Sequence, residues 1–273
     1  MKLELDCYTF GQIPLNTAGE IIDYAKEIGI SSIDTAALYS GSESALGRLN
    51  IEDFDVITKT VKIDRTISRQ ENFELFREAF YQSQRNLGYI ELYGLMFQSA
   101  QDLLSEQGLA LWDLVNDFKD KEYVYKLGTA VTEPEELADI LDTVDIDIVQ
   151  IPLNLLDQRF IGMLPELKRK RIEVHTRGTF LQGLILMNRY QIPEYFREII
   201  PVIASIPEPK AAYALSFPKL IKEIDKISIG VRSKRELEEI FSMYNFDVET
   251  VDYSVFRVDK PEFINPSVFN INM

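Results

Sequence analysis

Three side chains in the first quarter of the chain could together donate a proton to a substrate. Asp34 ends a short apolar run, Tyr39 follows it closely, and Lys59 ends the next apolar run. A free phenol has a pKa of about 10, which is too high for an efficient proton donor at neutral pH. A nearby ammonium group lowers the pKa of a phenol, and a carboxylate fixes the ammonium in place. The set therefore predicts Tyr39 as general acid, tuned by Lys59, with Asp34 orienting Lys59.

Each of these residues also has an ordinary structural interpretation. Asp34 could cap a helix, Tyr39 could be a half-buried loop residue, and Lys59 could be an exposed lysine at a strand end. The one histidine of the chain, His175, is expected to be a hydrogen-bonded structural residue near the end of a strand. The catalytic interpretation requires that the ends of successive strands meet at one edge of a sheet.

The chain has the rhythm of repeated βα units, since eight short apolar runs alternate with longer stretches of helical period. The runs do not alternate strictly, as expected for strands that are covered on both faces. Eight such units joined by right-handed crossovers close into a barrel with its chemistry at the carboxyl ends of the strands. We predict a single (β/α)8 TIM barrel domain over residues 1–273. The expected strands are Lys2–Tyr8, Ser31–Asp34, Asp55–Lys59, Glu91–Phe97, Val124–Ala130, Ile146–Ile151, Ile172–Thr176 and Lys226–Gly230.

Helix starts are marked by a Ser or Thr followed three residues later by Glu, the capping-box pattern. Pro134 fits the first turn of its helix. Phe73, Phe76 and Phe80 fall on one helix face and are expected to pack against the barrel. The expected capping pairs are Thr17 with Glu20, Thr132 with Glu135, and Ser233 with Glu236.

Size and composition narrow the class of protein. The 273 residues, 46% of them hydrophobic, can form a large core, and no apolar run is long enough to span a membrane. The N-terminus lacks the apolar core of a signal peptide, and a single cysteine, Cys7, fits a reducing cytoplasm. The net charge of -15 argues against nucleic acid and anionic membranes as partners. No metal site is expected, and the oligomeric state stays open.

Residues 34–47 carry the pattern Asp-Thr-Ala, Tyr, Ser-Glu and Leu-Gly, and Lys59 follows in register. This pattern resembles the aldo-keto reductase family. The resemblance implies NADPH-dependent reduction of a small-molecule carbonyl substrate, with NADH possible as cofactor, and names Asp34, Tyr39 and Lys59 as catalytic. The fourth catalytic residue of the family is a histidine, and Gln98 takes its place here. The Gln98 amide can donate a hydrogen bond, but it cannot relay a proton.

The resemblance also implies a cofactor site from three later segments. Gln150 is expected to bind the nicotinamide carboxamide. A helix N-terminus with a serine cap and a neighbouring arginine suits a phosphate, although a plain helix cap explains the same residues. The other expected cofactor residues are Arg177, Gln182 and Gly183 in the loop after the seventh strand, and Gly230, Arg232, Ser233 and Glu239 at the adenosine phosphate.

The tail at residues 264–267, Tyr93-Gly94 and residues 180–183 resemble one bacterial branch of the family. Members of that branch are often associated with surface-polysaccharide and nonulosonic-sugar pathways, which implies a sugar-derived substrate.

Several positions depart from the family pattern, and they keep a second function open. Each departure removes a hydrogen-bond donor or adds negative charge where an anionic cofactor is expected. The alternative is therefore a catalytically weakened relative that binds nucleotide or a partner without efficient turnover. An isomerase or lyase that uses Tyr39 and Lys59 is a third possibility, without a positive feature. The departures are Asp6 and Cys7 for Gly-Thr, Ala130 and Val131 for Ser-Asn, Glu236 for Gln, and Ile240 for Asn.

Overall fold

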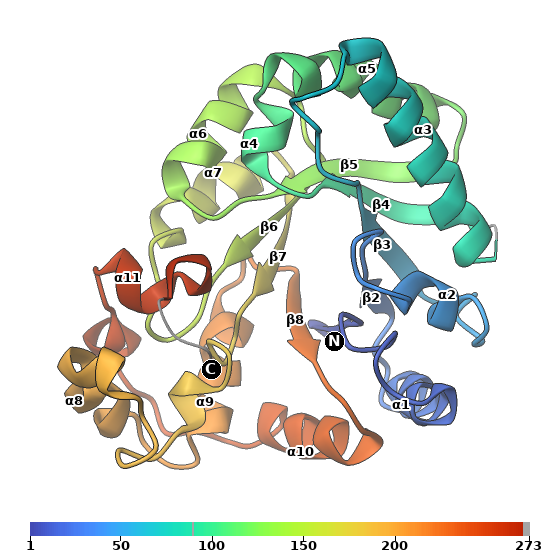
Figure 1. Ribbon diagram of the computed structural model, residues 1–273. Coiled ribbons are helices and arrows are strands. Elements are labelled where there is room, and N and C mark those ends of the chain that lie inside the picture. Colours follow the sequence, from blue (N-terminus) through green and yellow to red (C-terminus); the bar gives the residue numbers. More distant parts are fainter. Residues whose placement is uncertain (89, 270–273) are drawn as a thin grey trace.

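The computed structural model describes residues 1–88 and 90–269, and its centre is a closed barrel of eight parallel strands. The strands follow one another in chain order, and β8 pairs with β1 to close the ring (Figure 1). The predicted TIM barrel is confirmed. The strands are β1 Leu3–Asp6, β2 Ser32–Asp34, β3 Asp55–Lys59, β4 Leu92–Phe97, β5 Val124–Ala130, β6 Ile148–Pro152, β7 Glu173–Arg177 and β8 Lys226–Gly230.

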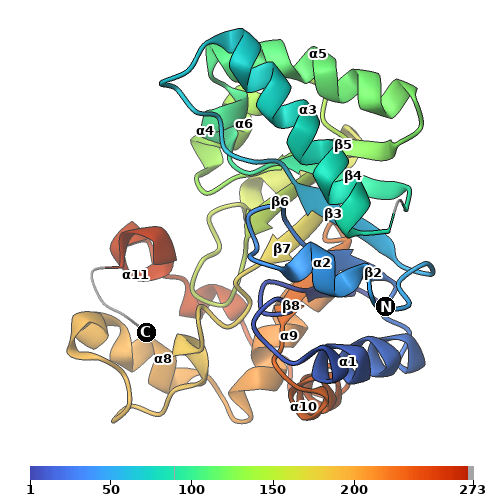
Figure 2. The same ribbon diagram turned by 45° about the vertical axis from the view of Figure 1, so that its right-hand side comes forward.

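Helices surround this barrel. In both ribbon views, α3 and α5 lie together on the opposite side of the molecule from α8 and α11, and α1 lies beside α10 (Figures 1 and 2). The α-helices are α1 Leu15–Glu27, α2 Ser42–Leu46, α3 Arg69–Asn86, α4 Ala100–Leu103, α5 Glu106–Asp120, α6 Pro134–Thr143, α7 Leu164–Arg169, α8 Ile200–Ser205, α9 Lys210–Leu220, α10 Lys234–Tyr244 and α11 Pro261–Ile264. The 3-10 helices are η1 Ile161–Met163, η2 Leu184–Leu186, η3 Glu194–Ile199, η4 Tyr253–Phe256 and η5 Pro266–Val268.

The predicted bounds of β3, β5 and β8 are those observed, and the other strands differ by one or two residues at their ends. The strand β1 is shorter than predicted for a visible reason. The amide of Tyr8 donates to the Asp6 carboxylate at 2.8 Å, and the amide of Phe10 donates to the Cys7 carbonyl at 3.0 Å. These bonds turn the chain away from the barrel directly after Asp6.

Two of the three predicted capping boxes were wrong. The helix α1 begins at Leu15 after Pro14, so Thr17 lies inside its first turn and caps nothing. At α6 the box forms one residue later than predicted, between Glu133 and Glu136, although Pro134 does occupy the first turn. Proline fixes its own φ near the helical value, so the helix starts there and the residue before it becomes the cap.

At α10 the prediction is confirmed in part. The Ser233 hydroxyl accepts from the amide of Glu236 at 3.2 Å, as a capping serine does. The Glu236 carboxylate, however, accepts from the amide of Arg232 at 2.7 Å, rather than from that of Ser233.

The predicted aromatic face of α3 packs inward as expected. Phe76 and Phe80 are buried, Phe73 is half-buried against the core, and the ring of Phe80 stacks on Phe118 of α5 with centroids 4.0 Å apart. Inside the barrel, Gly128 on β5 allows a close approach, because a Cβ there would lie 1.9 Å from the Ile148 carbonyl oxygen. The carboxyl ends of the strands, where Asp34 and Lys59 lie, form the mouth of the barrel.

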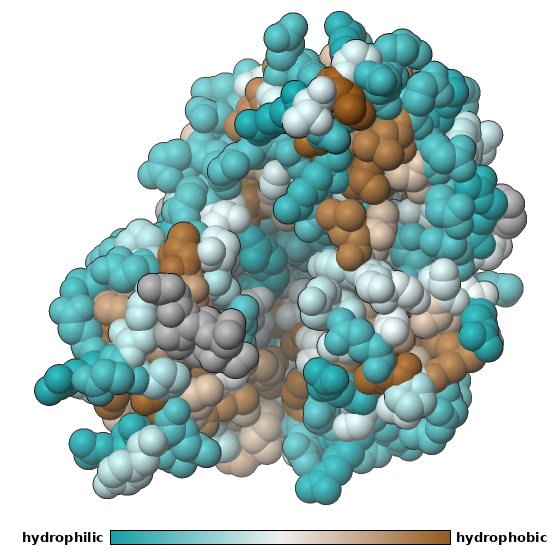
Figure 3. All heavy atoms as spheres, viewed as in Figure 1, coloured by the Kyte–Doolittle hydropathy of each residue, from teal (hydrophilic) through white to brown (hydrophobic). Residues whose placement is uncertain are grey.

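The face of the molecule that Figure 3 shows is largely polar and has a recess near its middle. Among residues 1–88 and 90–269, we find no helix with the length and apolar character that crossing a bilayer requires.

Candidate active site

Asp34 and Lys59 form a buried ion pair at the carboxyl ends of β2 and β3. Each residue is only 2% exposed, and the Lys59 ammonium also donates to the Thr35 carbonyl at 3.3 Å. Burial opposes the charge on Lys59, but the carboxylate of Asp34 and then Tyr39 raise the pKa of Lys59 well above its ordinary value. The ion pair therefore favours the charged form of Lys59 despite its burial.

Tyr39 lies beside this pair, as predicted. The Lys59 ammonium is 5.3 Å from the centre of the Tyr39 ring, and the ring of Tyr8 meets it edge-on at 5.0 Å. The left-handed backbone of Gly41, with φ of 73°, turns the chain from Tyr39 into α2. The local sequence thus directs the phenol back over the mouth.

The expected low pKa of Tyr39 was wrong as a net effect. Burial raises the pKa of Tyr39 to about 12, and the positive charge of Lys59 lowers it only in part. Lys59 does lower the pKa of Tyr39, as predicted, but the desolvation of the phenolate raises that pKa by more.

Gln150 reaches the same cluster through the barrel interior. Its side-chain amide donates to the second oxygen of the Asp34 carboxylate at 3.1 Å, although β6 and β2 lie across the barrel from each other. Asp34 is thus held by Lys59 on one oxygen and by Gln150 on the other. The Gln150 side-chain oxygen takes no part in that bond.

Asp6, at the end of β1, adds a second carboxylate to the mouth. Burial and then the charge of Asp34 raise the pKa of Asp6 to about 6. Asp6, which stands where the family pattern has a glycine, therefore places a titratable group close to the predicted catalytic residues.

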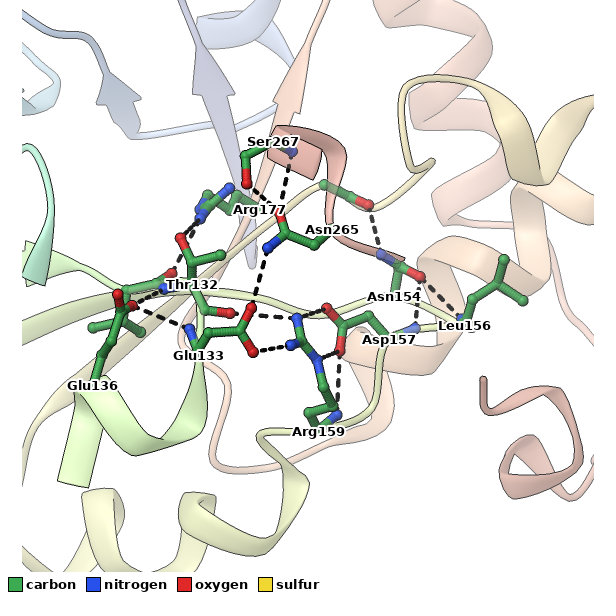
Figure 4. A network of polar contacts seen from close by, with 12 residues as sticks. Thr132, Glu133, Glu136, Asn154, Leu156, Asp157, Arg159, Arg177, Asn265 and Ser267 are labelled. Carbon is green, nitrogen blue, oxygen red and sulfur yellow. Dashed lines mark hydrogen bonds and ion pairs between the residues drawn. The ribbon is translucent and has the colours of Figure 1, made fainter. Parts of the chain in front are cut away.

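Arg177, at the end of β7, is bound to the turn between β5 and α6. Its guanidinium donates to the Val131 carbonyl at 3.1 Å and to the Thr132 hydroxyl at 3.2 Å (Figure 4). Within the described residues, the buried Nε of Arg177 has no hydrogen-bond partner. Arg177 is thus held between the end of β7 and the turn before α6.

A polar network beside Arg177 fastens the C-terminal segment to the same turn (Figure 4). Arg159 makes two 2.8 Å hydrogen bonds to Asp157 and pairs with Glu133. The Asn265 amide donates to Glu133 at 3.1 Å, and its oxygen accepts from the amide of Ser267 at 3.1 Å. The tail that the sequence singled out thus has a structural role next to the mouth.

The loop after β7 carries the predicted residues Gln182 and Gly183 in an uncommon conformation. Leu181, Gln182 and Gly183 have consecutive positive φ angles of 47°, 54° and 88°. For the two residues that are not glycine, this left-handed backbone is costly, and such strain gathers at ligand sites. The Leu181 side chain is buried and anchors the loop, while Gln182 is exposed.

A cleft of about 310 Å³ lies between this loop and α10. Predicted cofactor residue Glu239 lines it, while Ser233 caps α10, Gly230 ends β8, and the Arg232 side chain is exposed. The cleft residues are Phe180, Leu186, Ala211, Glu236, Glu239, Ile240 and Met243. Apolar walls with a few charged groups suit a flat aromatic ligand such as an adenine ring.

Comparison with known proteins agrees with this geometry. The model of the "Aldo/keto reductase family" matches residues 5–268. The chain belongs to the aldo/keto reductase family. Members of this family are NAD(P)H-dependent oxidoreductases.

One curated relative is the uncharacterized oxidoreductase YqkF of Bacillus subtilis (strain 168). It is 27% identical over 195 residues, which are 67% of this chain and 62% of that protein. The match thus spans less than two thirds of the relative's length.

Two solved structures share the fold. Aldo-keto reductase AKR11C1 from Bacillus halodurans, in its holo form, superposes with a TM-score of 0.74 at 18% identity, over 91% of this chain and 88% of that one. The glycerol dehydrogenase AKR11B4 from Gluconobacter oxydans gives a TM-score of 0.67 at 18% identity, with the same coverage of 91% and 88%. At this level of identity the similarity shows the fold alone.

Gln98 follows β4 directly, at the position where the sequence resemblance places the family's histidine. The residue is half-buried, and its side-chain oxygen is buried without a hydrogen-bond partner among the described residues. An amide at this position can both donate and accept, which the imidazole of a neutral histidine also does. It cannot take up a proton.

A chain of charged side chains below the mouth of this aldo/keto reductase was not predicted from the sequence. His175 lies 2.8 Å from both the Glu4 and the Glu173 carboxylates, and Glu173 pairs with Lys126. Burial lowers the pKa of His175, but Glu4 and Glu173 together raise it to about 9. His175 is thus the structural residue that was expected, although it is charged. The sequence does contain a sign of this chain, because β7 has an ionisable residue at every second position: Glu173, His175 and Arg177.

Proposed function

We propose that this aldo/keto reductase reduces a small, sugar-derived aldehyde or ketone to an alcohol, with NAD(P)H as reductant and Tyr39 as proton donor. The buried pair of Asp34 and Lys59 beside the Tyr39 ring carries the proposal. A bound nicotinamide would supply a hydride that forms a C–H bond at the carbonyl carbon, as the cofactor is oxidised to NAD(P)⁺. The carbonyl oxygen takes the Tyr39 proton and becomes the hydroxyl of the product.

The high pKa of Tyr39 is compatible with this role. A group with a pKa of about 12 keeps its proton until hydride arrives. An alkoxide is more basic than a phenolate, so the proton then moves to the forming product. The ammonium of Lys59 stabilises the phenolate that remains. Asp34 holds that ammonium in place, and Gln150 in turn holds the Asp34 carboxylate.

Gln98 is half-buried directly after β4, so its NH₂ group could donate to the carbonyl oxygen of a substrate. Its side-chain oxygen is buried and has no hydrogen-bond partner among the described residues, so it is not open to a substrate hydroxyl. The sugar-derived character of the substrate therefore rests on the sequence resemblance.

The residues in the mouth and along the cleft fit a nicotinamide dinucleotide. Gln150 can accept from the carboxamide with its free oxygen, Arg177 and the loop of Gln182 and Gly183 border the mouth, and Glu239 lines the cleft. The sequence resemblance favoured NADPH with Gly230, Arg232 and Ser233 at its phosphate. The proposal also takes residues 1–273 as one domain in a reducing cytoplasm.

A binding protein with little turnover is the second candidate. Ala130 lacks the hydroxyl that the resemblance places there, and Asp6 adds a carboxyl group with a pKa of about 6 beside the catalytic cluster. Both features weaken the site for an anionic cofactor without affecting the fold.

The two functions are separated by titrating the purified protein with NADH and NADPH and then adding glyceraldehyde. Nicotinamide fluorescence reports binding, and loss of reduced nicotinamide reports turnover. Binding with turnover supports the reductase, and binding without turnover supports the second candidate. If neither cofactor binds at millimolar concentration, the proposed reduction is wrong.

A further inference from the structure

The charged residues that line the cleft at α10 are both carboxylates. Glu236 and Glu239 lie along one side of this space, and the other lining residues are apolar. Arg235 donates to the Glu239 carboxylate at 3.0 Å, one turn along the helix. The nearest basic side chain in the sequence is therefore already paired with the acid that it would have to neutralise.

Two backbone amides at the start of α10 already have partners within the chain. The amide of Arg232 donates to the Glu236 carboxylate at 2.7 Å, and the amide of Glu236 donates to the Ser233 hydroxyl at 3.2 Å. A helix N-terminus binds phosphate through free amides and a positive dipole end. Here a carboxylate of the chain itself occupies that position, and the Arg232 side chain is exposed to solvent outside the lining of the cleft.

We propose that this nucleotide end selects the 2′-hydroxyl of NADH against the 2′-phosphate of NADPH, and that Glu236 is the main specificity-determining residue. A carboxylate accepts a hydrogen bond from a ribose hydroxyl, as acidic residues do in other dinucleotide sites. The same carboxylate repels a phosphate dianion. Glu239 also lines the cleft, but it is paired with Arg235, so Glu236 carries most of this repulsion. The inference rests on the proposed function, and it replaces the expected contact between Arg232 and phosphate.

The test compares nucleotide binding by the full chain and two variants. NADH and NADPH are titrated by nicotinamide fluorescence. Adenosine 5′-monophosphate and adenosine 2′,5′-bisphosphate are titrated by calorimetry, so that the adenosine end is also measured without turnover. The variants are Glu236→Gln and the matched control Glu238→Gln, whose carboxylate lies 3.8 Å from the Lys234 ammonium and does not line the cleft.

We expect the unmodified chain to bind NADH at least about tenfold more tightly than NADPH, and the monophosphate more tightly than the bisphosphate. The Glu236→Gln variant should tighten NADPH about tenfold, because removing a close negative charge is worth about 1.4 kcal/mol. The Glu238→Gln variant should leave the ratio unchanged.

Tighter binding of NADPH by the unmodified chain would overturn the inference and leave the proposed reductase intact. The inference would also be overturned if Glu236→Gln and Glu238→Gln changed the ratio of NADH to NADPH affinity equally. The overall negative charge of the helix, rather than the position of Glu236, would then explain the preference. Failure of all four nucleotides to bind would instead overturn the proposed function together with the inference.

Discussion

The two ends of the proposed cofactor site differ in how freely their residues can change. At the ends of β2 and β3, Asp34 and Lys59 are 2% exposed and depend on each other for charge compensation. At the start of α10, Glu236 and Glu239 lie on an exposed helical turn. A buried charge that loses its partner costs about 3–5 kcal/mol, whereas an exposed pair contributes about 1 kcal/mol or less. The catalytic end is thus fixed by the fold, while the nucleotide end can change its ligand preference at little cost.

The largest effect should come from Tyr39→Phe. Removing the hydroxyl should lower the rate of carbonyl reduction about 10²–10⁴-fold, because the positioned acid is lost. Cofactor affinity should stay within a few-fold, which would separate chemistry from binding at the catalytic end. Steady-state rates and nicotinamide titrations check both, with Tyr24→Phe on α1 as the matched control. A Tyr39→Phe enzyme that keeps most of its activity would place the acid elsewhere.

Lys59→Met should damage stability as well as turnover. The change leaves Asp34 buried without its partner, so we expect a loss of about 3–5 kcal/mol in the free energy of unfolding, measured with urea. Lys26→Met, which breaks the exposed pair with Asp53, should cost about 1 kcal/mol or less.

A double change sharpens this prediction. Asp34→Asn in the Lys59→Met background removes the unpaired charge and should restore much of the stability, but none of the activity. Equal small losses for Lys59→Met and Lys26→Met would show that burial does not distinguish the two regions.

His175, a buried charged residue below the mouth, should make the stability of the chain depend on pH. Its pKa is about 9 in the folded chain and about 6.5 in an ordinary environment. Its contribution is therefore fully present below pH 6.5 and is lost as the pH rises through about 9. We expect the unfolding free energy to fall by about 3 kcal/mol over this interval, since each pKa unit is worth about 1.4 kcal/mol. Urea titrations at several pH values measure it, and a His175→Gln variant that shows the same fall would refute the assignment.

Gln98→His should give the smallest effect, a gain of about tenfold in kcat on an activated aromatic aldehyde. The imidazole restores a group that can carry charge beside the substrate oxygen. Cofactor affinity should not change, because Gln98 follows β4, where the proposal puts the substrate carbonyl rather than the cofactor. If the original enzyme binds cofactor but is inactive, and Gln98→His leaves it inactive, the missing histidine does not limit this enzyme.

The barrel was predictable because its information is local. Apolar runs and helical stretches repeat at regular intervals. Asp34 and Lys59 stand at the ends of consecutive strands, with Tyr39 in the loop after the first, so topology brings them together. The contact of Gln150 with Asp34 across the barrel was not predictable from spacing. It depends on which side chains are long enough to meet in the interior.

Local energetics limited the sequence analysis elsewhere. The helix caps at Thr17 and Thr132 failed because Pro14 and Pro134 determine where those helices start. The predicted low pKa of Tyr39 was wrong because the depth of burial cannot be read from residue types. In the structure, desolvation raises this pKa by more than the charge of Lys59 lowers it. The contact of the Glu236 carboxylate with the amide of Arg232 was likewise not predictable, because it depends on the side-chain rotamer of Glu236.

The most direct test of the account is hydride transfer itself. The enzyme is given glyceraldehyde and reduced nicotinamide cofactor that carries deuterium at C4, and the alcohol product is examined by mass spectrometry and NMR. The account predicts that one deuterium is transferred to the former carbonyl carbon, and that Tyr39→Phe almost abolishes the transfer while the cofactor still binds. Product without deuterium, or no product despite saturating cofactor, would contradict the proposal that this aldo/keto reductase is a carbonyl reductase.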